Sequence, residues 1–368
     1  MKYVDEYRDR SLVKPLVAEL KKSVTKPARI MEVCGTHTVA VFRSGMRNTL
    51  LAEKGIELVS GPGCPVCVTS AKEIDSVARL ALEHRDRVTV TAYGDMFRAK
   101  GHELSLADAR AAGADIRMVT SPIENVRLAQ ENPQREIVFF AIGFETTQPG
   151  HAHTLIEAKR LGLPNLTFYL SHKVIAPALR LLAEHPALSL DGFILPGHVS
   201  AIIGEEPYRF LAEEYHLPGV IAGFEPGDIL VAVARLLAQR RAGACRIENA
   251  YRSTVRPEGN PRARELIARV FGSCDAHWRG IGTIPLSGHA LRRGLSEFDA
   301  HERFGLERVL EDEAGFGGCR CGEVLLGLIS PTDCAAFGGA CTPDSPLGPC
   351  MVSSEGACAN YFRFGERR

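Results

Sequence analysis

Cysteine is the residue type whose number and spacing in this chain most directly suggest chemistry. Six of the eleven cysteines fall within the last fifty residues: Cys319, Cys321, Cys334, Cys341, Cys350 and Cys358. This stretch is rich in Gly and Pro and shows little helical or strand periodicity. It cannot build a large apolar core, so disulfide bonds or a bound metal group must stabilise it. Because a chain without a secretory signal is expected in a reducing compartment, a metal or iron–sulfur group is favoured over disulfides.

The spacing of these cysteines leaves the kind of metal group open. A C-x-C pair is followed by cysteines separated by six, eight and seven residues. This pattern matches neither the bacterial ferredoxin run nor the paired C-x-x-C knuckles of a zinc ribbon. Four thiolates on a loop-rich segment suit a four-iron cluster, because each ligand needs only to reach the cluster. Zinc is the alternative.

A second sulfur motif, GPGCPVC, contains the C-x-x-C pair Cys64 and Cys67. It lies between an expected strand and an expected helix, where the helix N-terminus favours the thiolate of the first cysteine. This arrangement predicts a redox dithiol. Structural zinc is the alternative, with Cys34 and His37 as the two further ligands that zinc requires.

A third motif, CGTHT, holds Cys34, Thr36, His37 and Thr38, again between a strand and a helix. The field of the helix N-terminus is expected to lower the pKa of Cys34, and His37 could assist the thiolate or share a metal with it. The alternative is a buried, inert cysteine with Thr38 as the helix N-cap. His172, His198 and the Glu residues of GFETT and GFEPGD are weaker candidates, because such residues at strand ends are often structural.

Composition excludes several classes of protein. The 368 residues carry 44 Lys plus Arg and 44 Asp plus Glu, and this balance argues against nucleic acid or an anionic membrane as the main partner. The sequence shows no apolar signal region and no run long enough to span a bilayer, so a cytoplasmic location is expected. Neither a Walker A sequence nor a GxGxxG fingerprint follows any strand, which disfavours P-loop NTPases and nucleotide dehydrogenases.

Short apolar runs that alternate with helical patterns predict an α/β fold with mainly parallel sheets. The expected strands are Arg29–Val33, Ile56–Ser60, Arg87–Ala92, Ile116–Thr120, Glu136–Ile142, Leu166–Leu170, Gly192–Leu195 and Gly219–Ala222. The expected helices include Val13–Lys22, Val39–Lys54, Ala71–Glu83, Ile123–Glu131, Thr154–Leu161, Ala176–Glu184 and Asp228–Gln239. The sulfur motifs follow strands, and ligands bind beyond the carboxyl ends of parallel strands, so one functional rim is predicted.

We expect these elements to form two small α/β domains followed by an irregular C-terminal domain. The first domain would span 1–120 and hold CGTHT and CPVC, and the second would span 121–245. The segment 246–368, where the strand–helix rhythm fades, would be the cysteine-rich iron–sulfur domain.

Seven strings of the sequence carry a resemblance to a known family. They are MEVCGTHT (31–38), SGPGCPVCVT (60–69), TAYGDMFR (91–98), FFAIGFETTQP (139–149), LPGHVSAIIG (195–204), GFEPGDIL (223–230) and the tail CGEVLLGLISPTDC…CTPDSPLGPCMVSSEGAC (321–358). Together they resemble the HypD family of hydrogenase maturation (expression/formation) proteins, over nearly the whole chain.

This resemblance implies a scaffold on which the Fe(CN)2CO unit of [NiFe]-hydrogenases is assembled. It implies a small HypC-type chaperone and a HypE-type cyanide donor as partners, two α/β domains, and one [4Fe–4S] cluster. By motif, Cys34 would be a ligand of the iron, and Cys64 and Cys67 the redox dithiol. The implied cluster ligands are Cys334, Cys341, Cys350 and Cys358.

One feature departs from this assignment and one alternative function stays open. The C-x-C pair of Cys319 and Cys321 offers competing cluster ligands, whereas Cys245 and Cys274 match no motif and are expected to be structural. In the scaffold hypothesis His37, Thr36 and Thr38 orient or protonate incoming ligands of the iron. The alternative is a stand-alone reductase. In it, a dithiol linked to an iron–sulfur group reduces protein disulfides.

Overall fold

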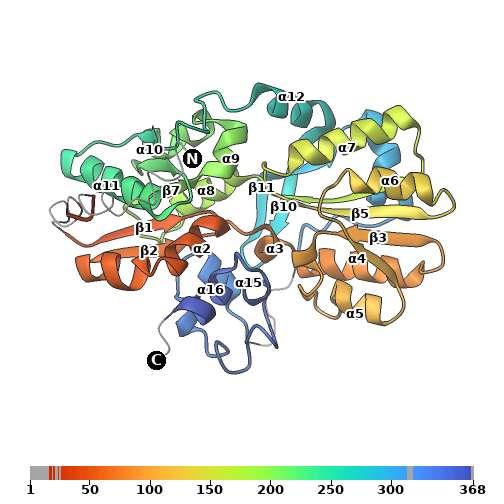
Figure 1. Ribbon diagram of the computed structural model, residues 1–368, viewed down its shortest axis with the longest axis horizontal. Coiled ribbons are helices and arrows are strands. Elements are labelled where there is room, and N and C mark those ends of the chain that lie inside the picture. The colour runs from red at the N-terminus through yellow and green to blue at the C-terminus, as the bar shows by residue number, and fades with distance from the viewer. Residues whose placement is uncertain (1–15, 19, 21–23, 25, 313–317, 366–368) are drawn as a thin grey trace.

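The structure is a computed structural model that describes residues 16–18, 20, 24, 26–312 and 318–365. It confirms the predicted α/β class, with two sheets whose strand pairs are all parallel within the described residues (Figure 1). The first sheet has the order β2 (Ile56–Ser60), β1 (Ala28–Glu32), β7 (Gly192–Pro196), β8 (Gly219–Ala222) and β9 (Ile247–Asn249). The second has the order β4 (Asp115–Met118), β3 (Val88–Ala92), β5 (Glu136–Gly143) and β6 (Leu166–His172).

The helices expected at Ala71–Glu83, Ile123–Glu131, Ala176–Glu184 and Asp228–Gln239 begin and end near the predicted positions, because local capping signals agree with the apolar pattern, whereas the one expected at Thr154–Leu161 begins earlier, at Gln148. For example, Ser70 and Glu73 form a capping box at the start of one helix, and Gly243 ends another in the left-handed conformation. The helices are α2 (Gly35–Arg43), α3 (Pro65–Val68), α4 (Ala71–Glu83), α5 (Leu106–Ala111), α6 (Glu124–Glu131), α7 (Gln148–Leu161), α8 (Ile175–Glu184), α9 (Gly197–Ile203), α10 (Arg209–Glu213), α11 (Pro226–Ala242), α12 (Pro261–Val270), α13 (Ala300–Phe304), α14 (Cys321–Leu325), α15 (Pro349–Val352) and α16 (Ala357–Phe364).

Two further expected helices differ from this arrangement or cannot be compared with it. The helix expected at Val13–Lys22 lies largely outside the described residues. The one expected at Val39–Lys54 is instead α2 followed by the wider turn of Met46–Leu51. Among the described helices, none has both the length and the apolar character needed to cross a membrane.

Both faces of each sheet are covered, which explains why the strands are almost entirely apolar. In the first sheet Ile194 packs in the core formed with α2 and α11, whereas its neighbour Phe193 packs in the core that includes α8 and α10. In the second sheet α4 and α5 lie on one face and α6 and α7 on the other (Figure 1).

The grouping of strands into sheets does not follow the boundaries expected at residues 120 and 245. β3 pairs with both β4 and β5, so the boundary near Thr120 falls inside the second sheet. The first sheet takes β1 and β2 from the start of the chain and β7, β8 and β9 from beyond residue 190. The physical reason is that β1 finds its second neighbour in β7, a pairing between distant segments that no local pattern encodes.

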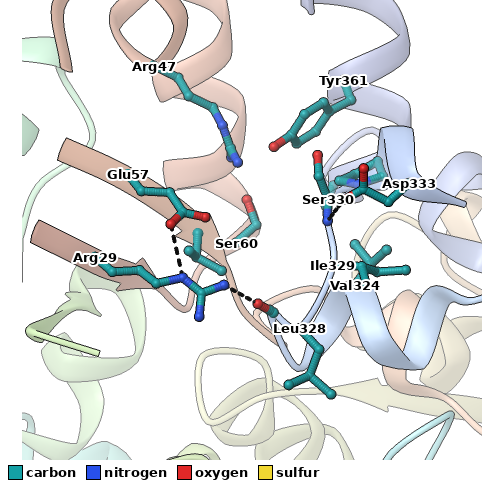
Figure 2. A pocket seen from close by; sticks show the side chains of 14 residues that line it. Arg29, Arg47, Glu57, Ser60, Val324, Leu328, Ile329, Ser330, Asp333 and Tyr361 are labelled. Atoms are coloured by element: carbon teal, nitrogen blue, oxygen red, sulfur yellow. Dashed lines mark hydrogen bonds and ion pairs between the residues drawn. The ribbon is translucent and has the colours of Figure 1, made fainter. Parts of the chain in front are cut away.

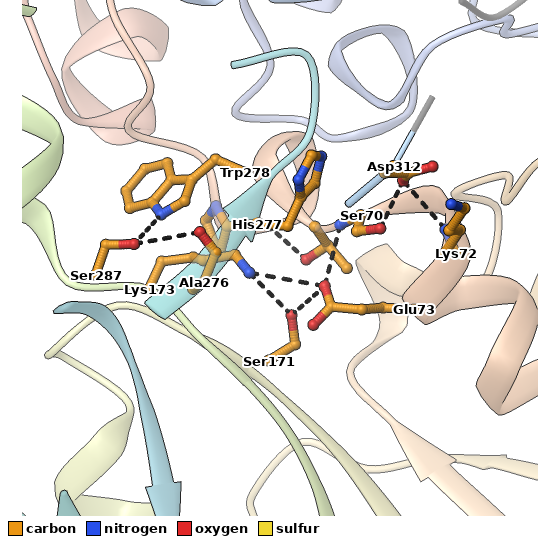
Figure 3. A network of polar contacts seen from close by, with 12 residues as sticks. Ser70, Lys72, Glu73, Ser171, Lys173, Ala276, His277, Trp278, Ser287 and Asp312 are labelled. Atoms are coloured by element: carbon orange, nitrogen blue, oxygen red, sulfur yellow. Dashed lines mark hydrogen bonds and ion pairs between the residues drawn. The ribbon is translucent and has the colours of Figure 1, made fainter. Parts of the chain in front are cut away.

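An antiparallel hairpin that the sequence did not suggest lies between the two sheets (Figure 1). It consists of β10 (Phe271–Trp278) and β11 (Gly282–Leu291). A buried polar network lies beside the hairpin. Figure 3 shows its ion pair between Lys173 and Glu73, at 3.6 Å, and the hydroxyl of Ser171, a residue of β6 in the second sheet. Trp278 of β10 donates its indole N–H to Ser287 of β11 at 2.8 Å.

The cysteine-rich C-terminal segment packs against the start of the chain. It contains the short helices α14, α15 and α16, of which α15 packs on α3 and α16 packs on α2. Figure 1 shows α15 and α16 close to α2 and α3, below the space between the sheets. The last described residues of the chain therefore lie beside α2 and α3, the helices that begin within the CGTHT and CPVC motifs.

Candidate functional site

The carboxyl ends of β1, β7 and β8 bring three of the motifs together at one rim of the first sheet. The ring nitrogen Nε2 of His37, from CGTHT, lies 2.8 Å from the carbonyl oxygen of Gly223 in GFEPGD. The rings of His37 and His198 both contact Phe224, with centroid separations of 4.8 and 3.9 Å. The predicted convergence of CGTHT, PGHVS and GFEPGD is thus present, because parallel strands end at the same edge.

The CGTHT and CPVC loops are in direct backbone contact. The N–H of Gly35 donates to the carbonyl of Gly63 at 3.3 Å. A Cβ atom on Gly63 would lie 2.4 Å from the backbone nitrogen of Cys34, so only glycine permits this approach. Cys64 and Cys67, both buried, form a disulfide at the start of α3. The structure therefore places a disulfide-bonded cysteine pair in the loop that contacts the Cys34 loop.

Burial controls the protonation of Cys34. The residue is 8% exposed and forms the N-cap position of α2. Desolvation raises the pKa of its thiol to about 12, opposed by the backbone N–H of His37 and reinforced by the carboxylates of Glu355 and Glu32. The expected lowering of this pKa by the helix N-terminus is wrong, because the desolvation of a buried thiolate outweighs the field of one short helix.

The threonines of CGTHT hold two carboxylates near Cys34. Thr38 donates its hydroxyl to Glu32 at 2.5 Å, and it is not the helix N-cap, since Cys34 occupies that position. Thr36 donates to Glu355 of the C-terminal segment at 2.9 Å. Burial raises the pKa of Glu32 to about 7, so this carboxyl exchanges its proton near neutral pH.

His37 is neutral at physiological pH. Burial lowers its pKa to about 4. Because the carbonyl of Gly223 can only accept, Nε2 carries the proton and Nδ1 keeps a lone pair. This Nδ1 atom is buried and finds no hydrogen-bond partner among the residues that the structure describes. The imidazole is therefore available as an acceptor rather than as an acid.

The C-terminal cysteines gather in one place, and the C-x-C pair belongs to the group. The thiol of Cys321 interacts with those of Cys319 and Cys350. A Cβ atom on Gly348 would lie 2.5 Å from the sulfur of Cys319 and 3.7 Å from that of Cys321. Burial, followed by the thiols of Cys321, Cys319, Cys341 and Cys334, raises the pKa of Cys358 well above its ordinary value.

The C-terminal thiols are donors of the kind that an iron–sulfur cluster uses. Within the described residues, no three His, Cys, Asp or Glu side chains are arranged to hold one metal ion. In a four-iron cluster each cysteine binds a different iron, so the thiols need not converge on one point. A buried cation, Arg279, faces this group, since Cys321, Cys319 and Cys350 counteract the lowering of its pKa by burial. Such a charge suits an anionic thiolate cluster.

The same arginine connects the thiol group to the CPVC loop. The backbone N–H of Arg279 donates to the carbonyl of Val68, next to Cys67, at 3.0 Å. Cys350 lies on α15, which packs on α3, the helix that carries Cys67. The three sulfur groups that are separate in the sequence are therefore neighbours in the fold, in the order Cys34, Cys64–Cys67 and C-terminal thiols.

Several residues of this region were missed by the sequence analysis. Glu32 and Glu355 lie inside strings that were noted for their cysteines, and the signal for Glu32 was a charged residue at the carboxyl end of a strand, two positions before Cys34. A further group is a buried chain in which the hydroxyl of Tyr93 lies 2.8 Å from Nε2 of His151, and Nδ1 of His151 lies 2.7 Å from Nε2 of His172. His172, treated as an isolated histidine, is part of this chain.

Comparison with known proteins gives one consistent result. A protein-family profile described as "HypD: Hydrogenase formation hypA family" matches residues 11–365. "Hydrogenase maturation factor HypD" of Rhodobacter capsulatus is 44% identical over 380 residues, covering 100% of this chain and 99% of that protein. The protein of the same name from Escherichia coli (strain K12) is 43% identical, covering 100% and 99%. "Hydrogenase expression/formation protein HupD" of Azotobacter chroococcum mcd 1 is 44% identical, covering 100% and 98%.

Proposed function

Because this chain belongs to the HypD family of hydrogenase maturation factors, we propose that it is the scaffold on which the Fe(CN)2CO unit of [NiFe]-hydrogenases is assembled. The observation that carries the proposal is the backbone contact between the Cys34 loop and the Cys64–Cys67 loop. A metal-binding thiol and a redox couple are thereby held side by side.

In this proposal the iron unit is the cargo and Cys34 is its ligand on this chain. Thiolate is a soft donor that suits low-valent iron bearing cyanide and CO. Since the thiol of Cys34 has a pKa of about 12, it reaches the iron as a thiol and releases its proton on binding. A small HypC-type chaperone would supply a second cysteine ligand, and a HypE-type protein would deliver cyanide.

Cys64 and Cys67 supply reducing equivalents in this proposal. Oxidation of the dithiol to the disulfide releases two electrons and two protons, and reduction takes them up again. A [4Fe–4S] cluster held by Cys334, Cys341, Cys350 and Cys358 would provide one-electron transfer at this place. Cys319 and Cys321 lie in the same thiol group, so they remain competing ligands.

The residues around Cys34 position the cargo. Thr36 and Thr38 are fixed by Glu355 and Glu32, so their hydroxyls and carboxylates form a polar wall beside the thiol. Neutral His37 presents an acceptor nitrogen. The protonated carboxyl of Glu32, whose pKa is about 7, can donate a hydrogen bond or its proton to the nitrogen of a cyanide ligand, and the resulting carboxylate can take the proton back. Neutral His37 and the threonine oxygens can accept the proton of an incoming protonated ligand.

The test is the Cys34→Ala variant, purified without oxygen together with the small chaperone. We expect the infrared bands of iron-bound cyanide and CO to be lost, while the absorbance of the iron–sulfur cluster is kept. Cys245→Ala is the matched control, because Cys245 is half-buried and lies in no motif, and it should keep both signals. Infrared bands that persist in Cys34→Ala would contradict the role of Cys34. Loss of both signals would show a folding defect, which circular dichroism would reveal.

The stand-alone reductase is the second candidate, since the structure holds Cys64 and Cys67 as a disulfide beside further thiols. The two functions differ in their need for a partner. A reductase turns over protein disulfides without the chaperone, and its activity does not depend on Cys34. A scaffold shows neither property.

A further inference from the structure

A polar cavity of about 160 Å³ lies between the first sheet and the C-terminal segment (Figure 2). The sheet side contributes Arg29, Arg47 and Ser60, and the C-terminal side contributes Ser330 and Tyr361. No cysteine lines this cavity, so it is distinct from the sulfur groups described above.

The two arginines of the cavity differ in how their charge is balanced. Arg29 is paired with Glu57 at 3.1 Å and donates to the carbonyl of Gly327 at 2.6 Å. Arg47 has neither an ion pair nor a hydrogen bond within the described part of the chain. Its guanidinium instead stacks on two rings, 5.0 Å from the centroid of Phe42 and 4.5 Å from that of Tyr361.

Arg47 is therefore a partly buried cation for whose five N–H donors the described residues supply no acceptor. Burial lowers its pKa, with Tyr361, Glu32 and Glu57 opposing this from a distance, yet a guanidinium keeps its charge in a protein. A buried charge without a partner is costly, and cation–π contacts recover only part of that cost. This energy is regained if an anion enters the cavity.

The carboxylates at the cavity are already engaged elsewhere. Glu57 is paired with Arg29, and Asp333 accepts the backbone N–H of Ser330 at 2.9 Å. Hydroxyl groups also line this space: Figure 2 shows the oxygens of Ser60 and Tyr361 turned toward the same space as the Arg47 guanidinium, with Tyr361 interacting with Ser330 and Ser60 with Glu32. Ala357 also lines the cavity as the first residue of α16, an end that no side chain caps.

We propose that this cavity binds a small oxyanion of the phosphate class, held by the Arg47 guanidinium and by the hydroxyls of Ser60, Ser330 and Tyr361. A planar guanidinium with hydroxyl donors matches tetrahedral oxygen atoms. The volume lies well below that of pockets for drug-sized ligands, so it admits a phosphate group and excludes the nucleoside of a nucleotide.

Binding would also fasten the cysteine-bearing segment to the first sheet. Arg47 and Ser60 belong to the sheet side, whereas Ser330 and Tyr361 belong to the segment that carries the C-terminal cysteines. An anion that contacts both sides stabilises their packing in proportion to its occupancy. This inference stands whether or not the protein assembles iron, because it uses none of the residues assigned to that function.

The experiment is calorimetric titration of the full-length protein, purified without oxygen in phosphate-free buffer, with inorganic phosphate at constant ionic strength. Saturable binding at one site per chain is expected. Arg47→Gln should bind about ten- to hundredfold more weakly, the loss expected for a charge-assisted contact. Arg43→Gln, an exposed arginine on neighbouring α2, is the matched control and should bind like the wild type.

A second variant tests the same cavity in case Arg47→Gln does not fold. Tyr361→Phe keeps the ring under the guanidinium and removes one hydroxyl, so binding should weaken by a smaller factor while the fold is retained. Tighter binding of glycerol phosphate than of phosphate would identify a phosphate ester as the ligand, and the reverse would identify the free ion. Absence of phosphate binding by the wild type, equal binding by wild type and Arg47→Gln, or acetate binding as tightly as phosphate would overturn the proposal.

Discussion

At the scale of single residues, burial outweighs local fields around Cys34. A helix N-terminus favours a thiolate or a carboxylate by a modest amount, whereas complete desolvation of a charge costs several times more. The thiol of Cys34 and the carboxyl of Glu32 are both held toward their neutral forms for this reason. A metal that bound at Cys34, as proposed, would therefore have to displace the proton of its thiol.

The pH dependence of stability should report this directly through Glu32. Its pKa is about 7 in the folded chain and 4.5 as the ordinary value, so the folded state binds a proton more tightly than the unfolded state. The stabilising contribution is complete below pH 4.5 and is lost as the pH rises to about 7, by about 3 kcal/mol. Glu32→Gln should remove this slope in urea unfolding between pH 4.5 and 7.

Glu145 offers the comparison for that measurement. Burial raises its pKa to about 7 as well, so it contributes a slope of the same sign that stays in Glu32→Gln. The double variant with Glu145→Gln should then lose both contributions. What remains is an opposite slope from buried histidines such as His37, whose pKa is lowered to about 4, so that their stabilising contribution grows as the pH rises to 6.5. An unchanged slope in Glu32→Gln would show that Glu32 ionises normally in the folded protein.

At the scale of elements, the loop after β1, which holds Cys34, and the loop after β2, which holds Gly63, contact each other closely. A side chain at Gly63 would meet the backbone of Cys34 and of Val33, neither of which can rotate away. Gly63→Ala should therefore lower the free energy of unfolding by about 1–3 kcal/mol. It should also separate Cys34 from the Cys64–Cys67 loop and reduce iron loading.

Gly272→Ala is the control for this variant. A Cβ at Gly272 meets nothing within 4 Å. Its free energy of unfolding should match or exceed the wild-type value, by up to about 1 kcal/mol. If urea unfolding shows Gly63→Ala to be as stable as Gly272→Ala, the two loops are not locked together by this contact.

The sequence predicted the elements more fully than their assembly. All eight expected strands are present, and β2 and β8 have the expected bounds, because fully buried parallel strands are continuous apolar runs. β9 and the hairpin were missed, since IEN is short and polar and FGSCDAHW contains no β-branched residue. The packing of α15 on α3 is a long-range contact, and no local pattern encodes it.

At the scale of the whole molecule, the two sheets differ in how far their strands are separated along the chain. The second sheet is built from the continuous segment 88–172, whereas in the first sheet Ile30 pairs with Gly192. Closing the longer loop costs more entropy before any contact repays it. The second sheet is therefore expected to form first.

Pulse-labelling hydrogen exchange during refolding tests this order. Amides of β5 and β6 should gain protection in an earlier phase than those of β1 and β7. The edge strand β4 serves as an internal control. Because it belongs to the second sheet, its amides should gain protection after those of β5. Protection of β1 ahead of β5 would contradict the argument.

The contact of Glu355 with Thr36 has a consequence for a cell that makes this protein. Thr36 and Glu355 lie 319 positions apart, and the strand before Cys34 pairs early with β2 but with β7 only after residue 192 has been made. The carboxylate wall beside the thiol therefore forms only after Glu355 has been synthesised. If Cys34 holds iron as proposed, a polypeptide truncated before Glu355 would have to hold it without this wall.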